Sequence, residues 1–296
     1  MTHKESFLQY LEIIKRYSPN TVRSYKNDLD SFFYFLASRD LPADPQSVTS
    51  GDIREWIREL VGGETAAASS TIHRKVSCLR VFFKYLRKEG IMSSDPLEKV
   101  VLPRKKKVLP VFVGEKSMES LLDNVDFGKD YQGLRDKTII ELFYMTGMRR
   151  AELIGLRTAD VDLVEGTVKV TGKRNKQRII PLVASFKTNL GEYLRVRNEF
   201  AGSAEGWFFL TDKGTKMYDK FVYNVVNRYL SMVTTIEKKS PHVMRHTFAT
   251  HMLNRGADLN SIKELLGHAN LSATQVYTHN TFEKLRKVYE KSHPRG

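Results

Sequence analysis

The sequence predicts a mainly α-helical protein with a small antiparallel β-sheet, arranged in two domains. Apolar residues recur at helical spacing through most of the chain, and strand-like alternation is confined to one stretch that begins near residue 166. A basic segment flanked by prolines separates two regions of helical pattern. A length of 296 residues accommodates two domains of about 100 to 200 residues each, although length alone is also compatible with one domain.

Residues 1–100 show four helical patterns with aromatic-rich apolar faces. These faces contain Phe7, Leu8, Leu11 and Ile14; Val22, Tyr25, Leu29, Phe32, Phe33 and Leu36; Ile53, Trp56, Ile57 and Leu60; and Ile72, Val76, Leu79, Phe82, Phe83 and Leu86. The sequence therefore predicts a small all-α domain. The single cysteine, Cys78, lies within the fourth pattern, so we expect a core residue without a disulfide, as suits a reducing cytoplasm.

A basic segment over residues 101–112 follows this domain. Its four cations lie between two prolines, which disfavours both helix and strand, and they are Arg104, Lys105, Lys106 and Lys107. We expect this segment to be an interdomain linker. A solvated loop without a partner is one interpretation, and contact with phosphates, which the basic flanking regions favour, is the other.

Residues 113–296 are expected to form the second domain. Helical patterns occupy residues 115–124 and 132–146, and alternation over 166–171 is followed by a polar turn over 172–178 and an apolar run over 179–182. This order predicts a β-hairpin with a cationic tip. Helical spacing resumes from Gly191, and a short amphipathic helix follows Tyr277, with an apolar face made of Phe282, Leu285, Val288 and Tyr289.

The charge of the chain indicates its class of partner. Lys and Arg number 48 against 34 Asp and Glu, which gives a formal net charge of +14, and the regions on both sides of residue 110 are basic. We expect a polyanionic partner, with nucleic acid favoured over an anionic membrane surface. Because the chain has no apolar signal segment and no run of about 18 apolar residues, we expect a cytoplasmic protein without a membrane span.

Four segments contain residues suited to chemistry on a phosphate group. They contribute Arg149 with Glu152, Lys173, His242 with Arg245, and His268 with Tyr277. The arginines Arg149 and Arg245 could bind both nonbridging oxygens of one phosphate, and the phenol of Tyr277 could act as a nucleophile. A surface position is the alternative for either arginine, and core packing is the alternative for Tyr277.

Two other kinds of site fit the sequence less well. His242 and His246 have the spacing of a helical zinc pair, but the glutamate base is missing and His251 turns to another face. Lys173 is followed by Arg174, where a phosphate-binding loop requires Ser or Thr. We therefore expect no metal and no cofactor.

Taken together, these segments resemble the tyrosine recombinase (phage integrase) family, and the size and layout are similar to its Xer-type members. The resemblance covers nearly the whole chain and rests on the order and spacing of Gly-Met-Arg149 with Glu152, Gly-Lys173, His242-x-x-Arg245, Leu-Gly-His268 and Tyr277. It implies an N-terminal SAM-like core-binding bundle and a C-terminal catalytic domain. The implied reaction cleaves and rejoins double-stranded DNA through a 3′-phosphotyrosyl bond, without metal or ATP.

The resemblance also implies roles for the residues around the phosphate. Arg149 and Arg245 would clamp the scissile phosphate, Lys173 would protonate the departing 5′ oxygen, and His268 would hydrogen-bond a phosphate oxygen. We take Arg149 rather than Arg150 as the first clamp because Arg149 directly follows Gly-Met, as in the family pattern.

The remaining implied roles concern the nucleophile and the surrounding DNA. Tyr277 would attack the phosphorus, His242 would act in proton transfer at the nucleophile, and Glu152 would orient the arginine-bearing loop. Further DNA contacts are expected from basic residues of the linker and the hairpin, which are Arg104, Lys105, Lys106, Lys107, Arg174 and Lys176.

At the level of assembly, the resemblance implies a homo- or hetero-tetramer on two DNA sites, with the C-terminal helix packed on a neighbouring subunit. Packing of that helix on its own domain is the alternative. A type IB-like topoisomerase or resolvase and an inactive DNA-architectural protein are the competing functions. The sequence does not distinguish chromosome partition by dimer resolution from mobile-element integration or DNA inversion.

Overall fold

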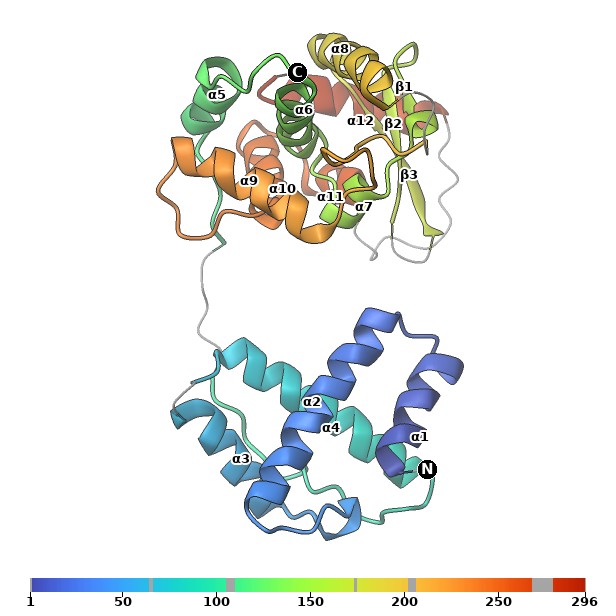
Figure 1. The fold of residues 1–296 in the computed structure, drawn as a ribbon, viewed down its shortest axis with the longest axis vertical. Coiled ribbons are helices and arrows are strands. Elements are labelled where there is room, and N and C mark those ends of the chain that lie inside the picture. Colours follow the sequence, from blue (N-terminus) through green and yellow to red (C-terminus); the bar gives the residue numbers. More distant parts are fainter. Residues whose placement is uncertain are drawn as a thin grey trace. The chain divides into compact units, whose positions relative to one another are not determined.

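The computed structural model describes residues 2–63, 66–104, 110–172, 175–201, 206–267 and 279–295 (Figure 1). The chain divides into two compact units, Met1–Val108 and Leu109–Gly296, and each is described by itself. The described residues are mainly helical, with one three-stranded antiparallel sheet, which confirms the predicted fold class. Within these residues, no helix is both long and apolar enough to cross a membrane.

The N-terminal unit is a bundle of helices, as predicted. Its elements are α1 (His3–Gln9), which continues as a π-helical turn over Tyr10–Ile14, then α2 (Pro19–Ser38), a 3₁₀ turn (Pro45–Ser47), α3 (Ser50–Gly62) and α4 (Ser69–Lys88). Local capping residues set these boundaries. Before α2, the hydroxyl of Ser18 accepts a hydrogen bond from the Thr21 amide at 3.3 Å, and Pro19 supplies a helical φ at the first position.

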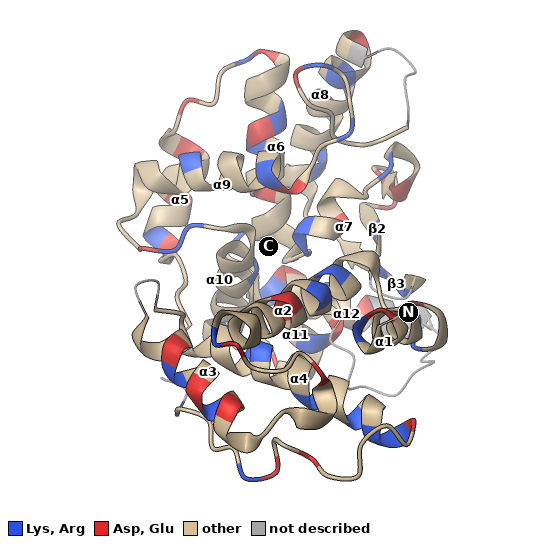
Figure 2. Ribbon diagram, turned by 60° about the horizontal axis from the view of Figure 1, so that its bottom comes forward, with Lys and Arg blue, Asp and Glu red and all other residues tan. Residues whose placement is uncertain are grey.

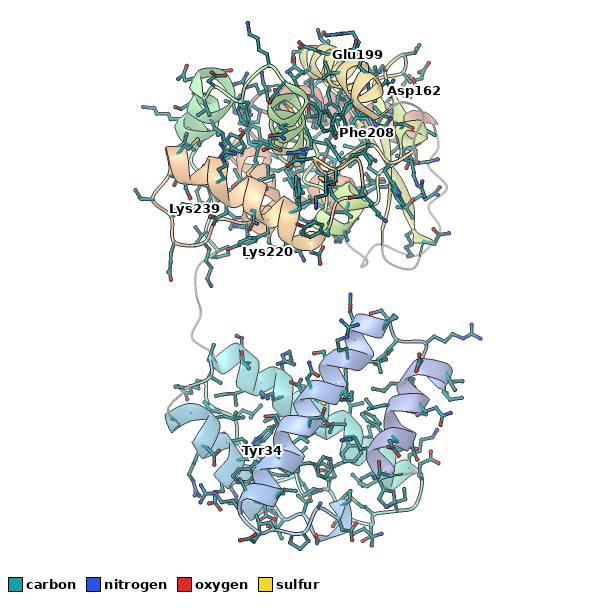
Figure 3. All side chains as sticks on the ribbon, viewed as in Figure 1. Tyr34, Asp162, Glu199, Phe208, Lys220 and Lys239 are labelled. Carbon is teal, nitrogen blue, oxygen red and sulfur yellow. The ribbon has the colours of Figure 1, made fainter. Side chains whose placement is uncertain are left out.

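Aromatic side chains fill the core of the N-terminal unit. Phe82 of α4 packs edge-on against Phe7 of α1, with ring centroids 5.2 Å apart, and Trp56 of α3 does the same against Phe32 of α2 at 5.0 Å. Cys78 is buried in this core, and its burial raises the pKa of the thiol to about 12. By contrast, Tyr34 of α2 is 78% exposed (Figure 3).

The C-terminal unit contains the sheet and eight helices among its described residues. The helices are α5 (Glu115–Asn124), α6 (Tyr131–Thr146), α7 (Arg150–Ile154), α8 (Ala184–Ala201), α9 (Asp219–Val233), α10 (Pro241–Asn254), α11 (Leu259–Leu266) and α12 (His279–Ser292). Helix α6 is buried along nearly its whole length and packs against both α8 and α10 (Figure 1). Phe208 also lies in this core (Figure 3). A helix that is buried on all sides forms the centre of a domain rather than its surface.

The sheet has the order β1 (Val161–Asp162), β2 (Thr167–Thr171) and β3 (Gln177–Pro181). Val168 pairs with Ile180 and Val170 pairs with Arg178, so these four side chains share the buried face. The predicted polar turn over 172–178 was therefore too long, because its last two residues belong to a strand. The predicted start of the next helix at Gly191 was also wrong, since α8 begins at Ala184.

Helix α12 packs on its own unit in the single chain. Leu285 and Tyr289 are buried against the core, and beyond the helix the His293 ring lies 3.1 Å from the carbonyl oxygen of Tyr144. The contact of this helix with a neighbouring subunit stays a prediction.

Candidate active site

The loop between α6 and α7 sets the position of Arg149. Gly147 ends α6 with a positive φ of 58°, and a Cβ atom there would lie 2.4 Å from the Phe248 ring and 2.7 Å from Leu266. The tight turn buries Met148 and places Arg149 directly before α7. Only glycine fits this turn, which explains why Gly precedes Met-Arg at this point of the sequence.

Glu152 is buried below Arg149 and contacts two arginines. Its Oε2 accepts the Arg149 backbone amide at 2.7 Å, and its Oε1 accepts the Arg149 guanidinium at 2.9 Å. Arg178 of β3 donates to both carboxylate oxygens, at 2.8 and 2.9 Å. Burial alone would raise the pKa of Glu152, but hydrogen bonds and charge from Arg178, together with those from Arg149, lower it to about 2. Glu152 is therefore ionised at neutral pH.

Three arginines from three different elements contact the end of α11. Arg178 donates to the carbonyl oxygen of Leu265 at 2.7 Å, Arg245 to that of Leu266 at 2.8 Å and Arg149 to that of Gly267 at 3.2 Å. These consecutive carbonyls form the negative end of the helix, where they lack partners within it. The three arginines together with Glu152 are named here the arginine cluster.

Helix α10 contributes Arg245 to the cluster, and this side chain is buried. Besides Leu266, its guanidinium donates to the carbonyl oxygen of Gly147 at 2.7 Å. Burial, followed by the positive charges of Arg149 and Arg178, lowers the pKa of Arg245 to about 10. Glu152 contacts Arg149 and Arg178, and its charge also acts on Arg245, so one carboxylate lies among three guanidinium groups. An excess of buried positive charge creates a site that favours an anion.

His242 lines the same hollow as Arg149 and Arg245. The hollow is also lined by Arg150, Asp219 and Tyr223. His242 and Arg245 lie three residues apart in α10, which begins at Pro241 after the capping residue Ser240. The arrangement can accordingly present one imidazole and two guanidinium groups to one anion.

The neighbouring candidates Arg150 and His246 have different surroundings. Arg150 forms an ion pair with Asp219 of α9 at 2.9 Å, whereas Arg149 contacts Glu152. Burial, followed by the nearby His242, lowers the pKa of His246. Among the described residues, no group of three or more His, Cys, Asp or Glu side chains lies close enough to hold a metal ion.

Several predicted residues lie outside the described ranges. They are Lys105, Lys106, Lys107, Lys173, Arg174, His268 and Tyr277. Arg104 and Lys176 are described, and both are exposed. His73 of α4 contacts the carbonyl oxygen of Pro103 at 2.8 Å, which fixes the chain just before Arg104. Lys and Arg occur on the helices of both units rather than at one end of the chain (Figure 2).

Sequence reasoning missed Arg178 as a member of the site. It was counted among the polar residues of the hairpin turn, but it lies in β3 with its side chain buried. A signal was present, because Arg178 and Ile180 have the two-residue spacing of one strand face.

Comparison with known proteins identifies the family of the chain. Residues 112–284 match the phage integrase family, and residues 5–90 match its N-terminal SAM-like domain. Tyrosine recombinase XerC of Chlorobaculum parvum is 38% identical over 98% of this chain and 94% of its own length. Tyrosine recombinase XerC of Thermodesulfovibrio yellowstonii is 39% identical over 98% of this chain and 95% of its own length.

Solved structures share the fold. XerH bound to its difH substrate before cleavage matches with a TM-score of 0.71 and 24% identity, over 98% of this chain and 85% of that one. The Tn1549 transposon integrase in complex with circular intermediate DNA matches with a TM-score of 0.70 and 20% identity, over 96% of this chain and 98% of that one. On the strength of the family match and the full-length relatives, the chain belongs to the phage integrase family and is a tyrosine recombinase of the Xer type.

Proposed function

We propose that this recombinase cleaves and rejoins double-stranded DNA at specific sites through a covalent 3′-phosphotyrosyl bond on Tyr277. The observation that carries this proposal is the arginine cluster, in which three guanidinium groups lie around the one carboxylate of Glu152 and two of them contact it. A scissile phosphate supplies the missing negative charge. The relatives agree with this substrate, since XerH and the Tn1549 integrase were solved with DNA.

In the proposed reaction, the phenol oxygen of Tyr277 attacks phosphorus while the bond from phosphorus to the 5′ oxygen breaks. The phenol proton passes to His242, and Lys173 gives a proton to the departing 5′ oxygen. Arg149 and Arg245 neutralise the charge that develops on the nonbridging oxygens, and His268 donates a hydrogen bond to one of them. Cations fixed around the phosphate perform the charge stabilisation for which other enzymes use a metal.

Rejoining follows the same path in reverse. A 5′-hydroxyl of the partner strand attacks the phosphotyrosine, a new phosphodiester bond forms, and the Tyr277 phenol is regenerated. The covalent bond conserves the energy of the original phosphodiester, so the exchange needs no ATP.

The proposal extends to the rest of the chain. We place the core-binding domain at residues 1–100, the linker at 101–112 and the catalytic domain at 113–296, and we assign DNA contacts to Arg104, Lys105, Lys106, Lys107, Arg174 and Lys176. Two DNA sites are joined by a homo- or hetero-tetramer in which the C-terminal helix of one subunit contacts the next. Cations that neutralise phosphates release counterions, so the affinity falls steeply with salt.

A nicked duplex tests the chemistry. On such a substrate the short 5′ fragment diffuses away, and the wild-type chain accumulates as a covalent adduct that denaturing electrophoresis detects. Tyr277→Phe forms no adduct, whereas the matched control Tyr34→Phe, at an exposed position of the N-terminal unit, forms it at the wild-type rate. An adduct in Tyr277→Phe, or DNA binding without any wild-type adduct, contradicts the proposal.

Exchange between two labelled duplexes separates recombination from its rivals. A recombinase joins strands from different duplexes, while a topoisomerase relaxes supercoiled DNA and restores the original partners. An architectural protein binds without cutting. The specific site itself is identified by crosslinking the chain to DNA and sequencing the bound fragments.

A further inference from the structure

We propose that Arg178 is a positioning residue of the recombinase site, which fixes Arg149 through Glu152 and fixes the end of α11 through Leu265. The inference rests on the proposed function, because it assigns a role in the same reaction. Arg178 contributes no atom to the substrate in this role. It determines where the phosphate-binding groups lie.

Position relative to the hollow separates Arg178 from the proposed phosphate-binding residues, because Arg149 and Arg245 line the hollow whereas Arg178 is not among its described lining residues. The Arg149 side chain is 40% exposed, whereas that of Arg178 is 6% exposed. Three hydrogen bonds hold the Arg178 guanidinium, two to the Glu152 carboxylate and one to the carbonyl oxygen of Leu265. A bidentate arginine–carboxylate pair has a fixed geometry, so Arg178 also fixes the orientation of Glu152.

Two routes lead from Arg178 to the phosphate-binding groups. Through Glu152, it determines where the Arg149 amide and guanidinium bind. Through Leu265, it holds the chain whose next two carbonyls bind Arg245 and Arg149. A Cβ atom on Gly267 would lie 3.1 Å from Arg178, so the two groups are in close contact. The buried Arg178 side chain therefore connects β3 to α7 and α11 by hydrogen bonds.

Charge around Glu152 gives this role a measurable signature. Three arginines face the carboxylate, from β3 (Arg178), from the residue before α7 (Arg149) and from α10 (Arg245). On the other elements packed against α7, Asp219 of α9 pairs with Arg150, and Lys169 of β2 pairs with Asp160. Removing Arg178 therefore removes the strongest partner of Glu152, and protonation of that carboxyl becomes easier.

The experiment measures the rate of adduct formation on nicked DNA across pH, for wild type, Arg178→Met and Arg178→Lys. Displacement of a reacting group by 1 Å can cost a factor of about 10², so we expect Arg178→Met to be about 100-fold slower at neutral pH. Its rate falls further on the acid side, because loss of Arg178 raises the pKa of Glu152 and the carboxylate is protonated more readily. The wild-type enzyme does not show this additional decrease.

Arg178→Lys keeps the charge and loses the bidentate geometry. We expect it to be about 10-fold slower than wild type without the additional acid-side decrease. In the double variant Glu152→Gln/Arg178→Met, the rate is no lower than in the slower single variant, because Arg178→Met already interrupts the route through Glu152. Arg178→Lys keeps the test decisive if Arg178→Met folds poorly.

Arg197→Met is the matched control. Arg197 of α8 is also buried in this unit, and it donates to the carbonyl oxygen of Trp207 at 2.6 Å. Its loss lowers thermal stability without adding a pH dependence. If Arg178→Met cleaves at the wild-type rate, or slows equally at every pH as Arg197→Met does, the positioning role is wrong. If wild type forms no adduct at any pH, the proposed function fails instead.

Discussion

Two charged groups in the C-terminal unit, one around Arg135 and the other the arginine cluster, have opposite charge balances. Arg135 of α6 contacts two carboxylates, Asp136 at 2.8 Å and Asp212 at 2.5 Å. Burial alone would lower the pKa of Arg135, but Asp136 and Asp212 raise it above its ordinary value. In the arginine cluster, three guanidinium groups lie around the single carboxylate of Glu152, and burial together with the charges of Arg149 and Arg178 lowers the pKa of Arg245 to about 10.

The difference separates an arginine that the carboxylates of its own chain balance from arginines to which we assign a bound anion. The group around Arg135 is neutralised by its own protein, so it stabilises the native state as it stands. The arginine cluster has more guanidinium groups than carboxylates, and under the proposed function a bound phosphate relieves their repulsion. Such preorganised charge is the main source of rate enhancement in many enzymes, and it is obtained at some expense of stability.

The largest expected effect comes from removing Arg135. Arg135→Met leaves Asp136 buried without its partner, which we expect to lower the free energy of unfolding by about 3 to 5 kcal/mol. Arg245→Met lowers it less, because it also removes repulsion with Arg149 and Arg178. Urea unfolding of both variants measures the difference. Equal losses would show that charge balance does not distinguish the two groups.

Arg245→Lys tests whether the arginine cluster acts in catalysis rather than in stability. A lysine ammonium cannot contact Gly147, Leu266 and a phosphate with the geometry of a guanidinium. We expect the rate of adduct formation to fall by about 10²- to 10³-fold with little change in melting temperature. Single-turnover kinetics on nicked DNA provides the measurement, and Arg135→Lys is the control that keeps its rate. A wild-type rate in Arg245→Lys would contradict the assigned role.

His293 extends the comparison to a buried base that is neutral at pH 7. Burial, only partly opposed by its contact with the Tyr144 carbonyl, lowers the pKa of His293 from 6.5 to about 4. The unfolded chain therefore binds more protons between these values, so stability is complete above pH 6.5 and is lost as pH falls towards 4. At 1.36 kcal/mol per pKa unit, the loss is about 3 kcal/mol.

Urea unfolding at pH 7 and about pH 4.5 tests this expectation in wild type and His293→Gln. The variant keeps a side-chain donor and loses the titrating group, so its stability changes less with pH. His251, whose pKa burial also lowers, acts in the same direction in both proteins. A pH dependence that is identical in wild type and variant would assign the acid sensitivity to other groups.

The smallest expected effect is stabilisation by a free anion. Inorganic phosphate that binds the arginine cluster at ten times its Kd adds about 1.4 kcal/mol to the free energy of unfolding. Melting temperatures measured with phosphate and with chloride at equal ionic strength show this gain in wild type. Arg245→Met is expected to lose it, whereas Arg197→Met is expected to keep it. An equal gain in all three proteins would reflect a general salt effect.

Local sequence signals explain which parts of the fold were predictable. The helix over residues 115–124 follows from apolar periodicity, whereas the helix over 131–146 is buried on nearly all sides and is marked by its flanking residues, such as Asp130, which caps α6. The grouping of Arg149, His242 and Arg245 depended on family resemblance, because nothing local connects segments about 100 residues apart. Their common hollow appears only in the folded chain.

Arg178 shows why part of the site escaped prediction. A cation on the inward face of a strand breaks the usual apolar pattern, so the residues before it were interpreted as one long turn. Its partner Glu152 lies 26 residues earlier in the chain. The other acceptors of the arginine cluster are the backbone carbonyls of Leu265, Leu266 and Gly267. Every residue has such a carbonyl, so the sequence does not indicate which ones bind an arginine.

The buried Cys78 has a practical consequence. It is the single cysteine of the chain, and a thiol with a pKa of about 12 carries almost no reactive thiolate at neutral pH. A second cysteine introduced at an exposed position such as Tyr34 therefore reacts alone with maleimide dyes. The native sequence is thus a ready background for fluorescence measurements on individual DNA-bound molecules, without prior removal of thiols.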